Sequence, residues 1–338
     1  MKQAAAIRPG ISPRRRAFAI LATLAALALL SIVAACLIGS VGLSPADLWQ
    51  GGAGSLGASV LELRLNRALA AFATGAMLSL AGVMMQALLR NPLADPYVLG
   101  VSGGAAVGAL AVMLFFGAAW MVDLAAFGGA MLVALLLYLL ARRDLRGAIA
   151  DGSNSLLLLT GVMVASGCGA LVTLMLSLAP DGRLRSMVFW LIGDLSASEP
   201  RPVLWLVLGA ALLFSLRAAR SINLMALHAD AAATLGVRVG ALRKGLFLAA
   251  ALLTAAAVSS AGSIGFVGLI VPHACRFALG PDHRLLLPAA TLAGGLFLVL
   301  ADTLARTVLG AQQLPVGVIT ALIGVPVFLV QLHHIRSR

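Results

Sequence analysis

The sequence predicts an all-α, polytopic membrane protein, and three observations support that prediction. First, only 11% of the 338 residues are charged and 61% are hydrophobic, whereas soluble domains carry about 25% charged residues. Second, the apolar residues gather into runs that approach the length of a bilayer crossing. Third, lysine and arginine are unevenly divided between alternate loops, as the positive-inside rule predicts for inserted helices.

The apolar runs predict ten membrane-crossing helices with both termini in the cytoplasm. They cover residues 17–39, 67–89, 98–117, 120–141, 155–179, 202–217, 245–262, 264–278, 285–305 and 316–333. With this topology, six of the 24 basic residues fall on the outer side: Arg64, Arg67, Arg183, Arg185, Arg201 and Arg306. A wrong number of crossings would scramble that asymmetry, so it supports both number and orientation. Residues 1–16 are then a cytoplasmic tail, and residues 17–335 form the membrane domain.

The first apolar run, Ala17–Ile38, follows three arginines and is too long for a signal-peptide core. No convincing small-residue cleavage site follows it, so it is interpreted as a retained helix. The segment from Leu43 to Leu63 is rich in glycine and is expected to be a flexible outer loop. The second helix then carries a stripe of small residues, Gly75, Ser79 and Gly82, which suits close helix contact.

A polar corner separates the second and third predicted helices. Asn91 and Pro92 end the second helix, and Asp95-Pro96 precede the third, which carries Gly103 and Gly104 near its start. Such a corner is expected to lie against protein or a water-filled cavity, because lipid cannot satisfy its backbone.

Two later segments are too short to cross a bilayer. Ser186–Leu195 is interpreted as a half-helix at the outer interface, with Trp190 as an aromatic anchor. Leu224–Leu235 is expected to form a short cytoplasmic helix that ends at Gly236. That helix could lie on the surface, insert between neighbours, or contact a partner.

The stretch Ala261–Arg284 combines apolar residues with glycines and a proline. Gly262, Gly265, Gly268 and Pro272 lie within it, and each glycine costs a helix about 1 kcal/mol relative to alanine. Its apolar part, 264–279, is short for a full crossing. We therefore expect a buried, broken or tilted helix whose basic end reaches water.

The sequence argues against several functions. Neither Lys2 nor Lys244 lies in a phosphate-binding loop motif, and the H-E-x-x-H and G-x-S-x-G motifs are missing. The three cysteines and five histidines show no ligand spacing, so no metal or cofactor is expected. The net charge of +12 follows from the positive-inside rule and not from nucleic-acid binding. Mid-membrane carboxylates, typical of proton-coupled carriers, are also missing. The chain therefore resembles a passage energised by another subunit, and not an enzyme.

Three motifs resemble signatures of the FecCD family, the permease subunits of ABC importers for ferric siderophores, haem and vitamin B12. The first is RNPLADP at 90–96 with LGVSGGA at 99–105. The second is GFVGLIVPH at 265–273 with Arg276, Gly280, Asp282, His283 and Arg284. The third is LPVG at 314–317 with Gly324, Pro326 and Phe328. The resemblance implies a ten-helix protomer in the inner membrane that forms a homodimer. It also implies two cytoplasmic ATPase subunits, a periplasmic substrate-binding protein, and alternating access at the dimer interface.

The resemblance also implies a coupling segment, at about residues 221–237, that contacts the ATPase. Its residues include Leu227, His228, Asp230, Leu235 and Gly236. The family pattern has Leu-Gly followed by acidic residues, whereas this chain has His228 and Ala229. An ordinary amphipathic loop helix is the alternative interpretation.

On the outer side, Arg64 and Arg67 match paired arginines that dock the binding protein, although Asn66 replaces the proline usual between them. Arg306 matches a third docking arginine. Snorkelling to the membrane interface is the alternative for all three, and an i, i+4 pair with Asp302 is a further alternative for Arg306.

The remaining expectations concern the passage itself. Ser153, Asn154 and Ser155 align with the family's cytoplasmic gate, and a plain helix cap is their alternative role. His273, Met84, Met85 and Met113 are interpreted as packing residues, because a passage must not hold its substrate. The residues assigned to the translocation path and its helix packing are Gly75, Gly82, Asn91, Pro92, Gly103, Gly104, Gly265, Gly268 and Pro272.

Two other functions remain possible at this stage. A secondary transporter or channel that works alone would not bind an ATPase, and a structural membrane scaffold would not transport. The sequence leaves open which chelate is carried.

Overall fold

The computed structural model describes residues 13–39, 56–142, 153–196, 201–227, 229–310 and 313–336. In these ranges the regular secondary structure is helical. The helices are α1 (Pro13–Leu37), α3 (Leu56–Leu89), the 3-10 helix η1 (Pro96–Leu99), α4 (Val101–Phe115), α5 (Ala119–Leu140), α6 (Ser153–Leu178), α7 (Asp181–Ile192), α8 (Pro202–Leu227), α9 (Ala229–Thr234), α10 (Val239–Ala261), α11 (Val267–Leu279), α12 (His283–Thr307) and α13 (Val316–Arg336).

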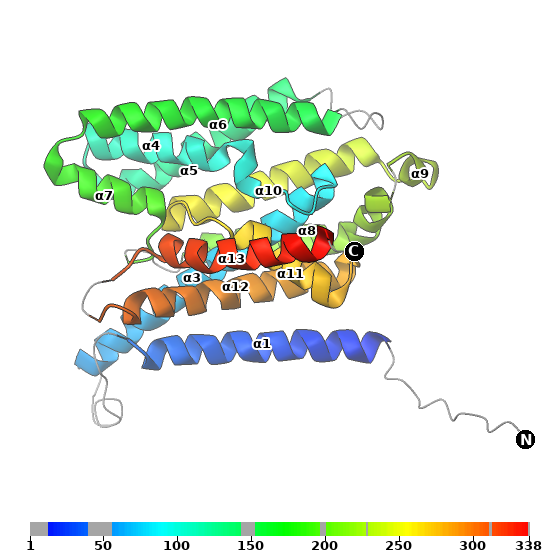
Figure 1. Ribbon diagram of the computed structural model, residues 1–338, viewed down its shortest axis with the longest axis horizontal. Helices are drawn as coiled ribbons and strands as arrows, with labels where there is room; N and C mark the ends of the chain where they lie inside the picture. Colours follow the sequence, from blue (N-terminus) through cyan, green and yellow to red (C-terminus); the bar gives the residue numbers. More distant parts are fainter. Residues whose placement is uncertain are drawn as a thin grey trace, which may run out of the picture.

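The long helices run side by side along the longest axis of the molecule, as Figure 1 shows. Short α9 lies at one end of the bundle and short α7 at the other, and we call these the α9 end and the α7 end. Helix α1 begins and helix α13 finishes at the α9 end (Figure 1). The start of the first helix and the end of the last helix therefore lie on the same side of the bundle.

Within the described ranges, seven helices are long and apolar enough to cross a membrane: α1, α3, α5, α6, α8, α10 and α12. Helices α4, α11 and α13 are shorter apolar helices. A helix lies at each of the ten predicted crossings, and the seven long ones confirm an all-α, multi-pass chain. The number ten and the cytoplasmic location of the termini stay predictions.

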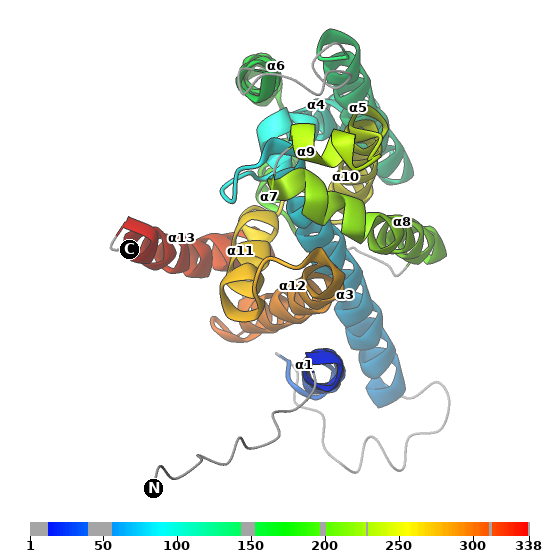
Figure 2. The ribbon, with the colours of Figure 1, turned by 90° about the vertical axis from the view of Figure 1, so that its right-hand side faces the viewer.

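Helix α3 occupies the centre of the bundle and crosses it obliquely, as comparison of Figures 1 and 2 shows. Its C-terminal two thirds, from Ala68 onward, is almost entirely buried. The sequence explains this position, because alanine, glycine and serine let neighbouring backbones come close on several sides. Helices α10, α11 and α12 all pack against it.

The structure corrects two predicted boundaries. The second helix begins at Leu56 and not at Arg67, so residues 56–63 are helical where a flexible loop was expected. Leucine, glutamate and arginine are strong helix formers and follow Gly57 without a proline, so the glycine-rich composition is misleading there. Helix α8 continues past Arg217 to Leu227. The predicted single helix 224–235 is consequently divided between the end of α8 and the short α9.

Candidate translocation and coupling sites

The small residues of α3 lie at direct backbone contacts with α12. A side chain at Gly75 would overlap the carbonyl oxygen of Gly294, and a side chain at Gly294 would meet Ser79. The hydroxyl of Ser79 donates to the carbonyl of Ala290 at 2.7 Å. The two helices therefore touch along a face from which side chains are excluded.

Four further glycine contacts involve residues of the predicted motifs. A side chain at Gly82 would overlap the carbonyl oxygen of Gly268 on α11, and one at Gly268 would lie 2.8 Å from the Cδ atom of Pro96. On α4, Gly103 lies against Cys168 of α6, and Gly104 lies against Gly129 of α5. Gly265 differs, since nothing lies within 4 Å of the place its side chain would take.

The stretch after α10 is a true break between two helices. Helix α10 ends at Ala261 and α11 begins at Val267. Gly262 and Phe266 both have φ of 70°, which is common for glycine and unusual for phenylalanine. Residues 264 and 267 are buried, and Pro272 lies buried inside α11. The prediction of a buried, broken helix agrees with this geometry.

Tyr97 forms hydrogen bonds with main-chain groups that have no helical partner at that break. Its hydroxyl accepts a hydrogen bond from the amide of Ile264 at 3.1 Å and donates to the carbonyl of Ile264 at 2.9 Å. Asp194 adds a third contact, because its amide donates to the carbonyl of Ala261 at 3.0 Å. Within a membrane such backbone groups need partners from the protein, and the corner that was predicted to lie against protein supplies one.

Asp95 fixes the position of Tyr97. The Asp95 carboxylate caps η1 by accepting from the amide of Tyr97 at 2.7 Å. Burial raises the pKa of Asp95 to about 6, and the hydrogen bond from Tyr97 opposes that rise only in part. Asn91 holds the same corner, since its side-chain oxygen accepts from the amide of Leu93 at 2.9 Å. Pro92 lies exposed at the corner.

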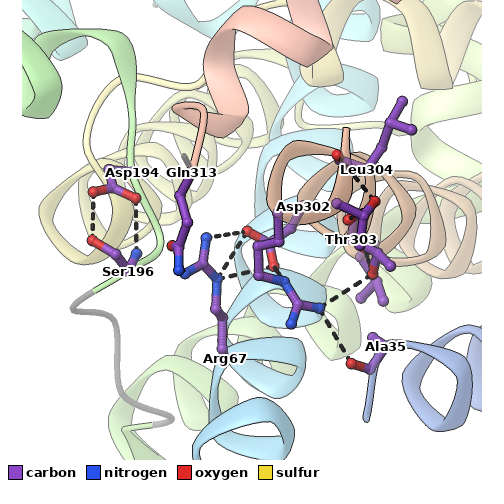
Figure 3. Close-up of polar contacts among 11 residues, drawn as sticks. Ala35, Arg67, Asp194, Ser196, Asp302, Thr303, Leu304 and Gln313 are labelled. Atoms are coloured by element: carbon purple, nitrogen blue, oxygen red, sulfur yellow. Dashed lines mark hydrogen bonds and ion pairs between the residues drawn. The ribbon is translucent and has the colours of Figure 1, made fainter. Parts of the chain in front are cut away.

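At the α7 end, Arg67 and Arg306 share the carboxylate of Asp302. Figure 3 shows Arg67 against Asp302. Arg67 donates to both oxygens of Asp302 at 2.8–3.0 Å and to Gln313 at 2.9 Å. The side chains of Arg67 and Asp302 are only 11% and 1% exposed. Arg306 forms the i, i+4 pair with Asp302 at 3.1 Å. A bidentate, buried pair of this kind is stronger than a surface ion pair.

Two of the three arginines also cap the C-terminus of α1. Arg64 donates to the carbonyls of Cys36 and Leu37 at 3.1 and 3.3 Å, and Arg306 donates to the carbonyl of Ala35 at 3.2 Å. Positive charge is favourable at a helix C-terminus, where carbonyl groups lack intrahelical partners. The arginines thus turn into the protein and do not snorkel toward an interface. Their docking role stays a prediction.

The predicted coupling segment presents apolar side chains at the α9 end. Leu227 and Leu235 are 72% and 67% exposed, while Ala229 and Ala232 anchor α9 to the bundle. Asp230 lies in the first turn of α9, and Gly236 ends the segment with φ of 83°. A groove of about 600 Å³ lies beside it between α8 and α10, with Leu224 and Arg238 in its walls. His228 lies outside the described residues.

The predicted gate residues Ser153, Asn154 and Ser155 form the first turn of α6. Their side chains are not among those that the structure describes, so neither the gate nor the cap interpretation gains support from their contacts. Helix α6 begins at the α9 end (Figure 1), and the gate role of its first turn stays a prediction.

Sequence reasoning missed a cavity of about 420 Å³ at the α7 end. Met113, Asp123, Arg183, Trp190 and Asp194 contribute to its walls. Arg183 caps α4 by donating to the carbonyls of Met113 and Leu114 at 3.1 and 2.7 Å. Asp194 holds the amide of Ser196 at 2.9 Å (Figure 3). The amphipathic sequence of α7 indicates a helix that lies on the bundle surface, but it does not reveal which helices α7 covers.

The described residues contain no group of three or more histidine, cysteine or acidic side chains that could hold a metal ion. His273 is buried, and Cys36, Cys168 and Cys275 are free and buried. Met84 and Met85 lie in the core and Met113 packs against it.

Comparison with known proteins gives a consistent result. The model of the FecCD transport family matches residues 26–334. A cobalamin import system permease protein BtuC from Halobacterium salinarum is 44% identical over 274 residues, covering 79% of this chain and 71% of that protein. A vitamin B12 import system permease protein BtuC from Escherichia coli is 39% identical over 311 residues, covering 90% and 92%. A solved structure described as an inward-facing metal-chelate type ABC transporter is 31% identical with a TM-score of 0.82, covering 94% of this chain and 99% of the other.

Proposed function

Because the chain belongs to the FecCD transport family, as its three motifs predicted, we propose that it is the permease subunit of an ATP-driven importer that moves cobalamin across the bacterial inner membrane. The observation that supports this most directly is the similarity to BtuC proteins along nearly the whole chain. Siderophore and haem are alternatives at the level of the family. The metal is cargo within the chelate, so the permease itself needs no metal site.

The proposed assembly is a homodimer with two ATPase subunits at the α9 end and a periplasmic binding protein at the α7 end. The α9 end is then cytoplasmic, and both termini lie there. Support comes from the basic residues near the ends of α3, α8 and α11, which suit the cytoplasmic side. The exposed Leu227 and Leu235 suit a groove on the ATPase, because apolar side chains at a water-facing end are otherwise costly.

We assign the contacts between α3, α11 and α12 to the moving part of the passage. Backbones that touch through Gly75, Gly82 and Gly268 can shift without disentangling large side chains. The break at 262–266 allows α11 to change its angle to α10. Gly103 and Gly104 give α4 the same close contacts, with α6 and α5, so α4 can also shift against its neighbours. Ser153–Ser155 would close the cytoplasmic side of the passage.

We propose that Arg64, Arg67 and Arg306 help to dock the binding protein both by contact and through the electrostatic potential that they create. Arg67 and Arg306 share one carboxylate, that of Asp302, so these two guanidinium groups bring net positive charge to the α7 end. Such a potential favours an acidic partner even when the guanidinium groups are held internally.

A transporter or channel that works alone is the second candidate, and reconstitution separates the two. The chain is placed in proteoliposomes with and without its cognate ATPase and binding protein, and uptake of cobalamin, a ferric siderophore and haem is measured. We expect cobalamin uptake only with both partners and ATP. ATP-independent uptake by the chain alone would establish the second candidate.

A further inference from the structure

The groove of about 600 Å³ between α8 and α10, beside the coupling segment, combines apolar walls with two cations. Its cations are Arg220 and Arg238, and its apolar side chains include Phe214, Leu224, Leu235 and Leu242. No carboxylate is among the described residues that line it. The functions proposed above assign Leu235 to the ATPase contact but leave the two arginines without a role.

The chain does not neutralise these two arginines. Both are exposed at the groove, and neither Arg220 nor Arg238 forms an ion pair or a side-chain hydrogen bond within the described ranges. The N–H donors of each guanidinium are therefore available to water or to a ligand. Two cations without a facing carboxylate give the groove a positive potential that favours an anion.

The two arginines lie at one level of the bundle. The Phe214 ring lies against Gly245 of α10, where an added Cβ would be 2.7 Å from the ring. Arg220 follows Phe214 by six positions on α8. Arg238 precedes Gly245 by seven positions, at the N-cap of α10. Because α8 ends and α10 begins at the α9 end (Figure 1), each arginine lies roughly 10 Å from this contact, toward that end. Both can therefore approach one ligand in the groove.

An apolar surface continues from the groove in the opposite direction, toward the middle of the bundle. Phe214, Leu213 and Leu206 on α8 are exposed, and so is Leu248 on α10. Helix α8 is long and apolar enough to cross a membrane, and Figure 2, which looks onto the α9 end, shows it at the rim of the bundle. In a membrane these side chains contact lipid acyl chains. The groove thus joins a cationic site at the water-facing end to a lipid-facing apolar surface.

We propose that the groove binds an anionic phospholipid of the leaflet at the α9 end. Its phosphodiester would lie between Arg220 and Arg238, since guanidinium groups bind phosphate oxygens through paired hydrogen bonds. Ser221 supplies a hydroxyl in the same wall. An acyl chain would pass Phe214 and continue along Leu213.

The arrangement of charge and apolar surface favours this ligand over two others. A soluble anion would bind the arginines but leave the apolar surface beyond Phe214 uncovered. A zwitterionic lipid such as phosphatidylethanolamine would bring an ammonium group beside two cations, and the described walls hold no carboxylate to receive it. Basic pockets between membrane helices bind anionic head groups for the same reasons.

The bound lipid would contact both helices that flank α9. It would join the end of α8 to the start of α10 next to Leu235, and so lie beside the proposed ATPase contact. A segment of the ATPase is the competing occupant of the groove, so the test uses the chain without an ATPase. The inference requires only a multi-pass chain in a membrane and does not depend on the solute transported.

Lipid binding is tested on the full-length chain in nanodiscs in which the fraction of phosphatidylglycerol in phosphatidylethanolamine is varied. Native mass spectrometry counts the lipids that stay bound after release from the nanodisc. One test variant, Arg220→Gln with Arg238→Gln, removes both cations. A second, Ala241→Trp, keeps them but fills the groove from its exposed α10 wall. The matched control, Arg276→Gln with Arg284→Gln, removes the same charge from α11 and the start of α12, at the same end of the bundle.

We expect the unaltered chain to retain one phosphatidylglycerol in preference to phosphatidylethanolamine. Each arginine near an anionic lipid contributes about fivefold in affinity, so the double-arginine variant should bind phosphatidylglycerol about 25-fold more weakly. Ala241→Trp should lose the retained lipid, and the control pair should keep it.

Equal retention of the two lipids by the unaltered chain overturns the proposal and favours the ATPase as the occupant of the groove. Equal loss in the control pair also overturns it, because net charge alone would then explain the binding. Unchanged retention by Ala241→Trp would show that the lipid does not lie in the groove. The unaltered chain and Ala241→Trp decide the matter even if the double-arginine variant fails to fold.

Discussion

The hydroxyl of Tyr97 bonds both main-chain polar groups of Ile264, although 167 positions separate the two residues in the chain. The tyrosine lies between the two parts of the first family motif, and Ile264 directly precedes the second motif. Their contact explains why a helix can be interrupted deep in an apolar bundle, since the freed backbone finds its partners in one side chain. It also joins the corner after α3 to the hinge between α10 and α11.

Tyr97→Phe should therefore lower the free energy of unfolding by about 2–4 kcal/mol, because two buried backbone groups lose their partner. Chemical denaturation of the purified protein in detergent measures the change. Tyr138→Phe is the control: Tyr138 packs against Phe247, and its hydroxyl makes no hydrogen bond within the described residues. Equal losses in the two variants would show that the hydroxyl of Tyr97 is not the stabilising group.

Asp95 predicts a pH dependence of stability. Its pKa in the folded protein is raised to about 6 from an ordinary value of 3.8, so folding favours the protonated form. That contribution is complete below about pH 4 and is lost as the pH rises through about 6. Asp95→Asn keeps an acceptor for the amide of Tyr97 but cannot ionise. Its Tm should decline less between pH 4 and pH 7 than that of the unaltered protein, and parallel Tm profiles would refute this.

The sequence reveals this fold well where its signals are local. Apolar runs locate the helices, and Gly262 with Pro272 mark the broken one. The signals fail where the structure depends on distant contacts. Nothing in the sequence near Arg67 indicates that Asp302 holds it, because 235 positions separate them. Composition also misplaces the start of α3, since glycines at 51–57 obscure the helix formers that follow. The cavity beneath α7 was not predictable without knowing which helices α7 covers.

Glycine contacts should differ sharply in their tolerance of a methyl group. Gly82→Ala places Cβ against the carbonyl of Gly268, and such overpacking costs about 1–3 kcal/mol. Gly169→Ala on α6 meets nothing within 4 Å, and it should be neutral or stabilise by up to about 1 kcal/mol through helix propensity. Thermal unfolding of both variants tests the contrast. A stable Gly82→Ala protein with normal uptake would show that α3 and α11 separate easily.

The pair Arg67–Asp302 should contribute to stability far more than the pair Arg201–Asp123. Arg67→Gln leaves a buried carboxylate with Arg306 alone, and we expect a loss of about 3–5 kcal/mol. Arg201→Gln disrupts a much more exposed pair and should cost about 0–1 kcal/mol. A double variant, Arg67→Gln with Asp302→Asn, should recover part of the first loss. If the double variant recovers none of the lost stability, the damage from Arg67→Gln cannot be ascribed to a carboxylate left without its partner.

The coupling segment provides the prediction that separates function from folding. Leu227 and Leu235 are exposed in the isolated chain, so changing both to aspartate removes no core contact and should alter Tm little. In the assembled transporter the same change would put two charges into an apolar interface with the ATPase, where desolvation of each charge is costly. We expect ATP hydrolysis to become independent of transport, or the ATPase to dissociate.

The matched control for the coupling segment is Leu63→Asp, an equally exposed leucine on the N-terminal part of α3, toward the α7 end. Co-purification and ATPase activity with and without binding protein are measured for both variants. Stable assembly and full transport-linked hydrolysis in the Leu227→Asp, Leu235→Asp protein would remove the segment from the ATPase interface. Loss of function in Leu63→Asp alone would instead place the sensitive apolar contact at the opposite end of the bundle.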